Sequence, residues 1–375
     1  MIASASLKVE LGARSYVVHL GSGLLESAGA LLAPLLAEAR AFVVTDRQVA
    51  TAGHLERLED SLRRHGVTVV AATIPPGEAS KSFAQLDALC QRLLDAGVER
   101  RSTILALGGG VVGDLAGFAA AILLRGIAYV QIPTTLLAQV DSAVGGKTGI
   151  DTPQGKNLVG AFHQPRAVVI DLRTLTTLPK RELSSGFAEV VKYGAIRDGA
   201  FFAWLEDKAE DLLAGDEGAR LVAIRRSLAI KAEIVAADEK ETSGERALLN
   251  FGHTFAHALE AATGYGDALR HGEAVAMGMM MAARLSQRLG LATAAEEARL
   301  GRLLRRFGLP LWPEERGLRL DPGELLEHMR RDKKVDGGVL RFILWRGIGD
   351  AVLVPGVDTD QVRRLLDDVC GSQPR

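Results

Sequence analysis

The sequence of 375 residues contains only two cysteines, Cys90 and Cys370, and they lie far apart in the chain. Two distant cysteines give no disulfide framework, so we expect a reducing, cytoplasmic environment. Two thiolates alone also cannot complete a closed structural zinc site, which uses four ligands. A metal site in this chain would therefore need histidines or carboxylates.

The chain also lacks an excess of charge and lacks long apolar runs. Its 45 Lys and Arg residues stand against 46 Asp and Glu residues, so no general basic field favours nucleic acid or an anionic membrane. No apolar run approaches the roughly 20 residues that a membrane span needs, and the N-terminal segment lacks a signal-peptide pattern. We therefore expect neither a nucleic-acid partner nor a membrane partner.

Lysine is scarce as well, since only eleven of the 45 basic residues are lysines. Arginine serves as the general surface cation, so the remaining lysines carry information. Seven of them lie beside glycines, acids or histidines, namely Lys81, Lys147, Lys156, Lys192, Lys231, Lys333 and Lys334. A compact ammonium group suits single phosphate or carboxylate oxygens. For any one lysine, a solvated surface position is the alternative.

Two hydrophobic patterns divide the chain, and 47% hydrophobic residues over this length favour two domains with large cores. In the first half, β-branched runs alternate with amphipathic segments, which indicates a mostly parallel sheet covered by helices. The predicted strands are 6–11, 15–20, 41–46, 66–74, 102–109, 127–133 and 166–172, the first two paired around a turn at Gly12. We predict a Rossmann-like α/β domain over residues 1–182.

The second half has helical periodicity instead. Long helix-period segments cover 201–215, 221–240, 250–264 and 272–290, with no strand pattern among them. A small hairpin is predicted from 339–345 and 350–356, followed by a terminal helix. Residues 183–375 are therefore predicted to form a mainly α-helical C-terminal domain.

Two glycine motifs suggest anion binding, but neither is specific. Gly108, Gly110 and Gly113 fit G-x-G-x-x-G after a strand, where a helix N-terminus could hold a pyrophosphate; close helix–strand packing is the alternative. No acid follows at the distance usual for a ribose contact, so Asp46, at an earlier strand end, is the better candidate. The run 141–148 resembles a P-loop, but an aspartate replaces its first glycine, which excludes an ATPase or GTPase.

Three histidines and a glutamate suggest a metal site. His253, His257 and His271 lie within one short stretch, and Glu189 and Lys192 form a Glu-x-x-Lys pair upstream. Imidazole and carboxylate are the ligands of a catalytic zinc that keeps one position open. Simple spacing would choose the histidines four residues apart on one helix face, but geometry alone cannot select two ligands from three.

Seven motifs, in order from about Pro76 to Lys334, resemble those of the 3-dehydroquinate synthase family: GGGVVGDLAGFAA, QIPTTLLAQVDSAVGGKTGID, GKNLVGAFHQP, GFAEVVKYG, LLNFGHTFAHALE, HGEAVAMGM and RRDKK. The resemblance implies that family's fold and its reaction, in which 3-deoxy-D-arabino-heptulosonate 7-phosphate becomes 3-dehydroquinate and phosphate. It also implies NAD, one divalent metal (zinc or cobalt), a small sugar-acid phosphate as substrate, and a homodimer. NAD would lie across the first domain with its nicotinamide facing the metal at an inter-domain cleft.

The resemblance also implies roles for individual residues. The metal ligands would be Glu189, His253 and His271, which leaves His257 as a proton-transfer or hydrogen-bonding group and replaces the choice made from simple spacing. The implied catalytic residues are Lys147, Asn157, Lys192 and His257. The implied substrate-binding residues are Arg125, Asp141, Lys147, Lys156, Asn157, Lys192, Lys231, Arg246, Asn250, His257 and one of Lys333 and Lys334. The implied cofactor-binding residues are Asp46, Gly77, Glu78, Lys81, Gly110, Val111, Val112, Gly113, Asp114, Thr134, Thr135, Lys147, Lys156, Thr174, Leu175, Thr176 and Thr177.

Three alternatives stay open at this point. A metal-dependent polyol dehydrogenase would share the architecture, but it needs no lysine cluster and would accumulate NADH. Another sugar-phosphate cyclase, acting on sedoheptulose 7-phosphate, differs only in substrate. A non-catalytic metal- or nucleotide-binding protein is the third, although no expected ligand is missing from the sequence.

Overall fold

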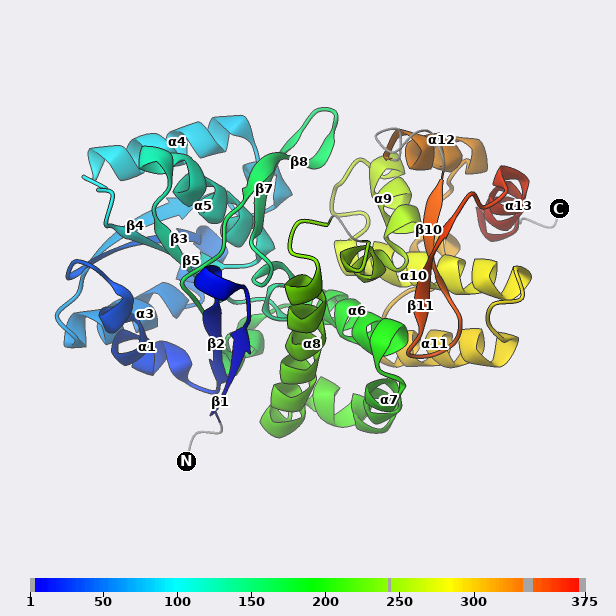
Figure 1. Cartoon of the computed structure of the whole chain (residues 1–375), viewed down its shortest axis with the longest axis horizontal. Helices are drawn as coiled ribbons and strands as arrows, with labels where there is room; N and C mark the ends of the chain where they lie inside the picture. Colours follow the sequence, from blue (N-terminus) through cyan, green and yellow to red (C-terminus); the bar gives the residue numbers. More distant parts are fainter. Residues whose placement is uncertain (1–3, 242–243, 333–339, 371–375) are drawn as a thin grey trace. The chain divides into compact units, whose positions relative to one another are not determined.

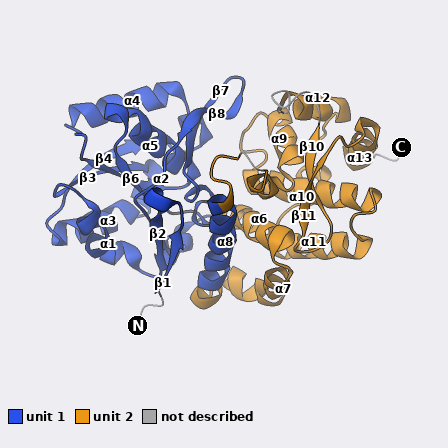
Figure 2. Cartoon of the chain, in the orientation of Figure 1, with its two compact units in different colours: residues 1–179, 220–236 blue, residues 180–219, 237–375 orange. Residues whose placement is uncertain are grey.

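The computed structural model describes residues 4–241, 244–332 and 340–370. It divides into two compact units, shown in Figure 2. The first comprises Met1–Pro179 and Arg220–Ala236, and the second comprises Lys180–Ala219 and Ala237–Arg375. Residues 220–236 thus belong to the first unit, whereas the sequence pattern places a single boundary after residue 182.

The first unit is built on a seven-stranded sheet, visible in Figure 1. Its strands, in spatial order, are β1 (Ser4–Val9), β2 (Tyr16–Gly21), β9 (Ala167–Asp171), β6 (Ala128–Pro133), β5 (Thr103–Gly108), β3 (Arg40–Asp46) and β4 (Thr68–Ile74). Only β1 runs antiparallel to its neighbour; all other pairs in the sheet are parallel. The predicted, mostly parallel α/β fold is confirmed.

Helices cover both faces of this sheet because alternate strand residues point to opposite sides. Its helices are α1 (Leu24–Leu32), α2 (Arg47–Thr51), α3 (His54–Arg64), α4 (Phe83–Asp95), α5 (Gly110–Ile122) and most of α8 (Glu217–Ala237). On β3, Phe42 and Val44 pack with α4 and α5, whereas Ala41 and Val43 pack with α1 and α3. Each sheet face therefore has its own apolar core.

An antiparallel hairpin, β7 (Lys147–Thr152) and β8 (Gly155–Phe162), adds a separate two-stranded sheet to the first unit. The sequence pattern did not predict it. Val159 and Ala161 pack against the core that contains α4 and α5, so the alternate residues of β8 face outward. The hairpin carries Lys147 at one end and Lys156 and Asn157 just after its turn.

The second unit is mainly helical, as predicted. Its helices are α6 (Lys180–Arg197), α7 (Gly199–Ala214), α9 (His253–Ala262), α10 (His271–Arg288), α11 (Ala294–Arg306), α12 (Pro322–Asp332) and α13 (Thr359–Cys370). The predicted hairpin is present as β10 (Arg341–Trp345) and β11 (Ala351–Pro355). Trp345 anchors it, because its indole N–H donates to the carbonyl oxygen of Ala195 on α6 at 2.7 Å.

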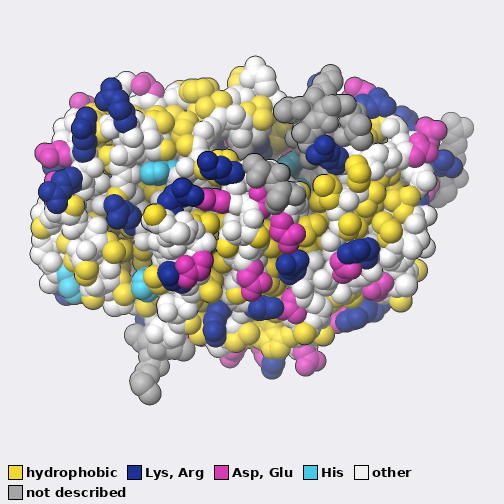
Figure 3. Space-filling view, in the orientation of Figure 1, with side chains coloured by type: hydrophobic (Ala, Val, Ile, Leu, Met, Phe, Trp, Pro, Cys, Tyr) yellow, Lys and Arg dark blue, Asp and Glu magenta, His cyan; other side chains and the backbone are white. Residues whose placement is uncertain are grey.

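Among the residues that the structure describes, none of the helices has the length and apolarity needed to cross a bilayer. Figure 3 shows basic and acidic side chains mixed over the visible face. This mixing agrees with the net charge of −1.

Candidate metal and substrate site

Three helices of the second unit bring two histidines and a glutamate together. Glu189 lies in the middle of α6, and His253 and His271 are the first residues of α9 and α10. Nε2 of His253 is 3.6 Å from Oε1 of Glu189, and Nε2 of His271 is 3.7 Å from the same oxygen. One possible ligand atom from each residue lies within 4.8 Å of the others. We call these three residues the metal triad.

Close packing of α6 against α10 sets the spacing of the metal triad. A Cβ atom on Gly272 would lie 2.0 Å from the carbonyl oxygen of Ser185, so only glycine fits at this crossing. The Gly272 N–H donates to Ser185 Oγ at 2.9 Å. Arg181 on α6 donates to both carboxylate oxygens of Glu273 on α10, at 2.8 and 2.7 Å. These contacts hold together the two helices that carry Glu189 and the second histidine.

Hydrogen bonds fix which nitrogen each histidine offers to a metal. Nδ1 of His253 lies 3.2 Å from the carbonyl oxygen of Phe251, and Nδ1 of His271 lies 3.3 Å from Oε1 of Glu260. A carbonyl or ionised carboxylate oxygen only accepts, so both Nδ1 atoms carry the hydrogen. Both Nε2 atoms, which face Glu189, are therefore the available ligand atoms.

The two histidines differ in charge when no metal is bound. Burial, with the nearby ammonium of Lys192, lowers the pKa of His253 to about 3. Burial alone would also lower the pKa of His271, but the carboxylates of Glu260 and Glu189 outweigh it and raise that pKa to about 10. Of the two histidines, His271 therefore carries the positive charge in the metal-free site. A divalent ion would replace that proton.

Lys192 and His257 border the metal triad. Lys192 follows Glu189 by three residues on α6, is 1% exposed, and its ammonium contacts the Glu189 carboxylate. The ring of His257 is half-buried and lies edge-on to that of His253, with ring centroids 5.7 Å apart. His257 is not part of the triad. Its position beside the site is compatible with the proton-transfer role that the resemblance implies.

Two further predicted substrate residues lie close in sequence before α9. Arg246 is 2% exposed, and its guanidinium donates to the carbonyl oxygen of Glu239 at 2.5 Å. Asn250 ends the short 3-10 helix Arg246–Asn250, three residues before His253. Their roles in substrate binding stay predictions.

In the first unit, predicted cofactor and substrate residues share one polar cluster. Nζ of Lys81 is 2.9 Å from Asp114 and 2.5 Å from Oδ1 of Asn157, and it lies 3.7 Å from Glu78. Lys156 in turn lies 3.5 Å from Glu78. Burial raises the pKa of Asp114, although the Lys81 ammonium opposes this. Lys81 therefore links Glu78 and Asp114, which are implied to bind NAD, to Asn157 of the hairpin, which is implied to bind substrate.

The remaining predicted cations have different surroundings. Lys231 on α8 donates to Oδ1 of Asp141 at 2.7 Å and to the carbonyl oxygen of the same residue at 2.5 Å. Lys147 is exposed at the start of β7, and Arg125 is exposed in the turn after α5. Lys333 and Lys334 lie outside the described residues.

The residues implied for NAD gather where the parallel strands end. Helix α5 begins directly after β5, and the Thr134 N–H at the end of β6 donates to the Gly108 carbonyl at 3.0 Å. The other members follow β3, β4 and β9, namely Asp46, Gly77 to Lys81, and Thr174 to Thr177. In open parallel sheets, ligands bind at the carboxyl ends of the strands.

Some of these residues also serve the fold. Asp46 caps α2, because its Oδ1 accepts the Val49 N–H at 2.9 Å. The hydroxyl of Thr177 is 2.8 Å from Nε2 of the buried His54. A direct contact of these residues with the cofactor stays a prediction.

Glu260 was not predicted from the sequence, although a signal for it exists. It follows His253 by seven residues on α9, two helical turns on one face. An acid at this spacing from a ligand histidine can hold another ligand histidine.

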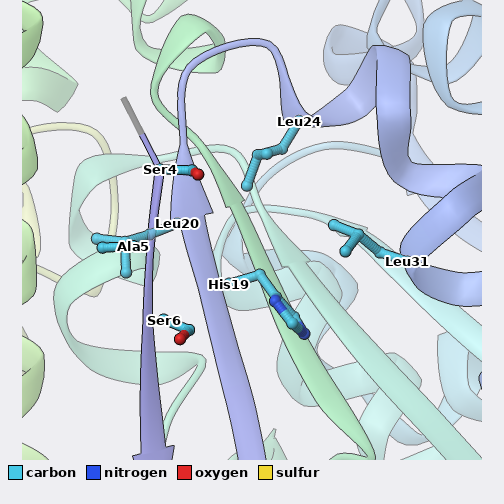
Figure 4. A pocket seen from close by; sticks show the side chains of 7 residues that line it. All are labelled: Ser4, Ala5, Ser6, His19, Leu20, Leu24 and Leu31. Atoms are coloured by element: carbon cyan, nitrogen blue, oxygen red, sulfur yellow. The ribbon is translucent and has the colours of Figure 1, made fainter. Parts of the chain in front are cut away.

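A separate groove of about 230 Å³, shown in Figure 4, lies at the edge of the first unit. It is lined by Ser4, Ala5, Ser6, His19, Leu20, Leu24 and Leu31. None of these is a predicted site residue. Burial lowers the pKa of His19, so the groove presents a neutral imidazole among serine, alanine and leucine side chains. It is small for a dinucleotide.

The fold and the metal triad define a metal-dependent enzyme with a parallel α/β unit and a helical unit. Family models match most of the chain. A model described as 3-dehydroquinate synthase N-terminal matches residues 71–185, and one described as 3-dehydroquinate synthase C-terminal matches residues 186–335. The chain belongs to the 3-dehydroquinate synthase family.

Individual proteins agree with this placement. The chain is 57% identical to a 3-dehydroquinate synthase of Rhodospirillum rubrum over 365 residues, which covers 97% of this chain and 94% of that protein. A solved 2-epi-5-epi-valiolone synthase of Streptomyces hygroscopicus subsp. jinggangensis, with NAD⁺ and Zn²⁺ bound, is 31% identical with a TM-score of 0.87. The match covers 96% of this chain and 98% of that one.

A solved 2-deoxy-scyllo-inosose synthase is also similar. It was determined with carbaglucose-6-phosphate, NAD⁺ and Co²⁺, is 26% identical, and has a TM-score of 0.86. The match covers 97% of this chain and all of the other. Two solved structures that are named for different activities thus share this fold closely.

Proposed function

We propose that the chain converts 3-deoxy-D-arabino-heptulosonate 7-phosphate to 3-dehydroquinate and inorganic phosphate, the second step of the shikimate pathway. The reaction consists of a transient oxidation at C5, elimination of phosphate, re-reduction, ring opening and an intramolecular aldol closure. The observation that carries the proposal is the metal triad with Lys192 beside it, in a chain 57% identical to a 3-dehydroquinate synthase.

The metal triad fits one divalent ion, zinc or cobalt. Two neutral imidazole nitrogens and one carboxylate oxygen are the donors that a catalytic zinc uses. Both Nε2 atoms face Glu189, and Glu189 is fully buried. When bound, the metal supplies Lewis acidity at the substrate oxygen that is oxidised.

The residues at the carboxyl ends of the parallel strands fit NAD. The N-terminus of α5, entered through Gly109 and Gly110, offers free N–H groups to a pyrophosphate. Asp46 offers a carboxylate to a ribose hydroxyl. NAD, when bound, accepts a hydride from the substrate and returns it in the same turnover, so it is used catalytically.

The chain's own side chains hold the substrate and manage its protons. Lys147, Lys156 and Lys192 offer ammonium groups to the phosphate and carboxylate oxygens. His257, half-buried beside His253, is placed to take and return a hydroxyl proton. The leaving phosphate can itself take the proton in the elimination, so the chain needs to orient the substrate more than it needs a strong base.

A homodimer in the cytoplasm belongs to the same proposal. Leu158 and Phe162 on the outer face of β8 are 61% and 49% exposed, and Phe83 at the start of α4 is 58% exposed. We propose that these exposed apolar side chains form part of the contact between the two copies. Both cysteines are free thiols, which fits a reducing compartment.

Light scattering after gel filtration tests the dimer. The unmodified chain should elute with the mass of two copies, and a double change of Leu158→Glu and Phe162→Glu should halve that mass. A monomeric parent protein, or an unchanged dimer in the double variant, would contradict this part of the proposal.

Substrate choice separates the proposal from another sugar-phosphate cyclase. Metal-loaded protein with NAD should release phosphate from 3-deoxy-D-arabino-heptulosonate 7-phosphate and yield 3-dehydroquinate. Sedoheptulose 7-phosphate should give no phosphate above background. Release from sedoheptulose 7-phosphate alone would overturn the assignment of substrate.

A further inference from the structure

Glu260 lies next to the metal triad without being part of it. It is on α9, two turns after His253, and only 2% exposed. Its Oε1 is 3.3 Å from Nδ1 of His271, across the α9–α10 contact. A carboxylate buried to this extent needs a cationic or hydrogen-bonding partner, and His271 supplies one.

The two histidines of the triad are oriented by unlike acceptors. The Nδ1–H of His253 points to the backbone carbonyl of Phe251, whereas that of His271 points to the Glu260 carboxylate. In both rings Nε2 lies on the side of Glu189, at 3.6 and 3.7 Å. Nδ1 of His271 therefore faces away from the centre of the triad, and Glu260 lies on that outer side of the ring.

We propose that Glu260 is a positioning residue that orients His271 as a metal ligand. The inference rests on the proposed function in one respect only, namely that the triad holds a divalent metal. The carboxylate fixes the ring rotation, keeps the hydrogen on Nδ1, and makes Nε2 a stronger donor. His253, with a neutral acceptor, is the weaker donor of the pair.

Zinc affinity measured by chelator competition, without NAD or substrate, tests this role. Glu260→Met removes the acceptor at similar volume and should weaken zinc binding by about 10- to 100-fold, whereas Glu260→Gln keeps an acceptor without charge and should weaken it by less. Glu297→Met is the matched control, because Glu297 pairs with Arg284 on α10 away from the triad and should leave zinc affinity unchanged. Affinity within twofold of the parent in both Glu260 variants would overturn the proposal.

Cobalt-substituted protein gives a second, selective readout. Each ligand histidine should give one exchangeable N–H resonance, shifted by the paramagnetic ion. The His271 resonance should vanish through solvent exchange in Glu260→Met and move in Glu260→Gln, while that of His253 stays. If Glu260 merely stabilised helix packing, both resonances would change or neither would, and either result would overturn the role.

These measurements are independent of turnover. Phosphate release by the unmodified protein tests the proposed function, and zinc affinity of the Glu260 variants tests the positioning role. A parent that binds zinc but releases no phosphate would count against the proposed function alone.

Discussion

At the scale of single residues, His257 and His271 have different surroundings and should respond differently to substitution. His271→Ala removes a ligand atom of the metal triad. We expect it to weaken metal binding by more than about 100-fold, beyond the loss typical of an orienting residue. His257→Ala should keep the metal and slow turnover by roughly 10²- to 10⁴-fold, the range of general acid–base catalysis. Metal analysis after dialysis, with steady-state rates, checks both; equal metal loss in the two variants would contradict the ligand assignment.

The charge on His271 predicts how metal affinity depends on pH. The pKa of His271 in the metal-free protein is about 10 and that of His253 about 3, so binding displaces one proton, from His271. Metal affinity should therefore rise about tenfold per pH unit between about pH 7 and pH 9. Chelator competition across this range measures the slope, and an affinity independent of pH would rule out a protonated His271.

The same raised pKa stabilises the metal-free fold at low pH. Because the folded value of about 10 lies above the unfolded value of 6.5, this contribution is complete below about pH 6.5 and disappears as pH rises through about 10. Metal-free protein should thus lose stability over this interval. Metal-loaded protein has no proton on Nε2 of His271 at any pH in this interval. Its stability should therefore not fall for this reason.

The sequence could predict the metal-ligand types but not, from spacing alone, the ligand set. His253 and His257 share a helix face, yet the structure brings His253 together with Glu189 and His271 from two other helices. Only the resemblance to a family distinguished these histidines. The contact between Glu260 and His271 depends on how α9 packs against α10, and this packing cannot be predicted from a local sequence pattern.

At the scale of secondary-structure elements, the crossing of α6 and α10 is the most demanding contact. Gly272→Ala would place a Cβ atom 2.0 Å from the Ser185 carbonyl, so the helices must move apart. We expect a loss of about 1–3 kcal/mol in the free energy of unfolding, typical of overpacking, and weaker zinc binding. Urea unfolding and chelator competition measure these effects.

Gly266→Ala is the control for that substitution. A Cβ atom there meets nothing within 4 Å, and the residue lies in the same unit between α9 and α10. It should leave zinc affinity unchanged. If Gly272→Ala bound zinc as tightly as Gly266→Ala, the crossing would not determine the geometry of the site.

Strands and helices with strong periodicity were predictable, and the β7–β8 hairpin was not. The β-branched runs of β3, β4, β5, β6 and β9 and the long helices α7 to α10 appear close to their predicted positions. The hairpin contains three glycines and few β-branched residues, so its sequence has no strand alternation to detect. Its position depends on tertiary contacts with α5 and on the hydrogen bond of Asn157 with Lys81.

At the scale of the whole molecule, the chain combines two units whose boundary is not a single point in the sequence. Helix α8 has the periodicity of the helical half, yet residues 220–236 belong to the α/β unit. Lys231 shows why, since it pairs with Asp141 in that unit. The chain thus returns to the first unit after it has entered the second. Long-range contacts determine this return, so it could not be predicted from composition or from hydrophobic periodicity.

A relative at high identity and two solved neighbours are similar to the chain over nearly its whole length. The two solved neighbours are named for activities that differ from that of the Rhodospirillum rubrum relative. The central claim is therefore that the chain uses NAD and a metal to eliminate phosphate, with no net oxidation of substrate. A polyol dehydrogenase of similar fold would instead produce one NADH for each product.

The most direct test of this claim is phosphate release with NAD limiting. Zinc- or cobalt-loaded protein receives a large excess of 3-deoxy-D-arabino-heptulosonate 7-phosphate over NAD, and phosphate and NADH absorbance are followed together. Our account predicts many phosphates released per NAD with no lasting rise in NADH. A rise in NADH that matches product, with release ending once NAD is consumed, would contradict it.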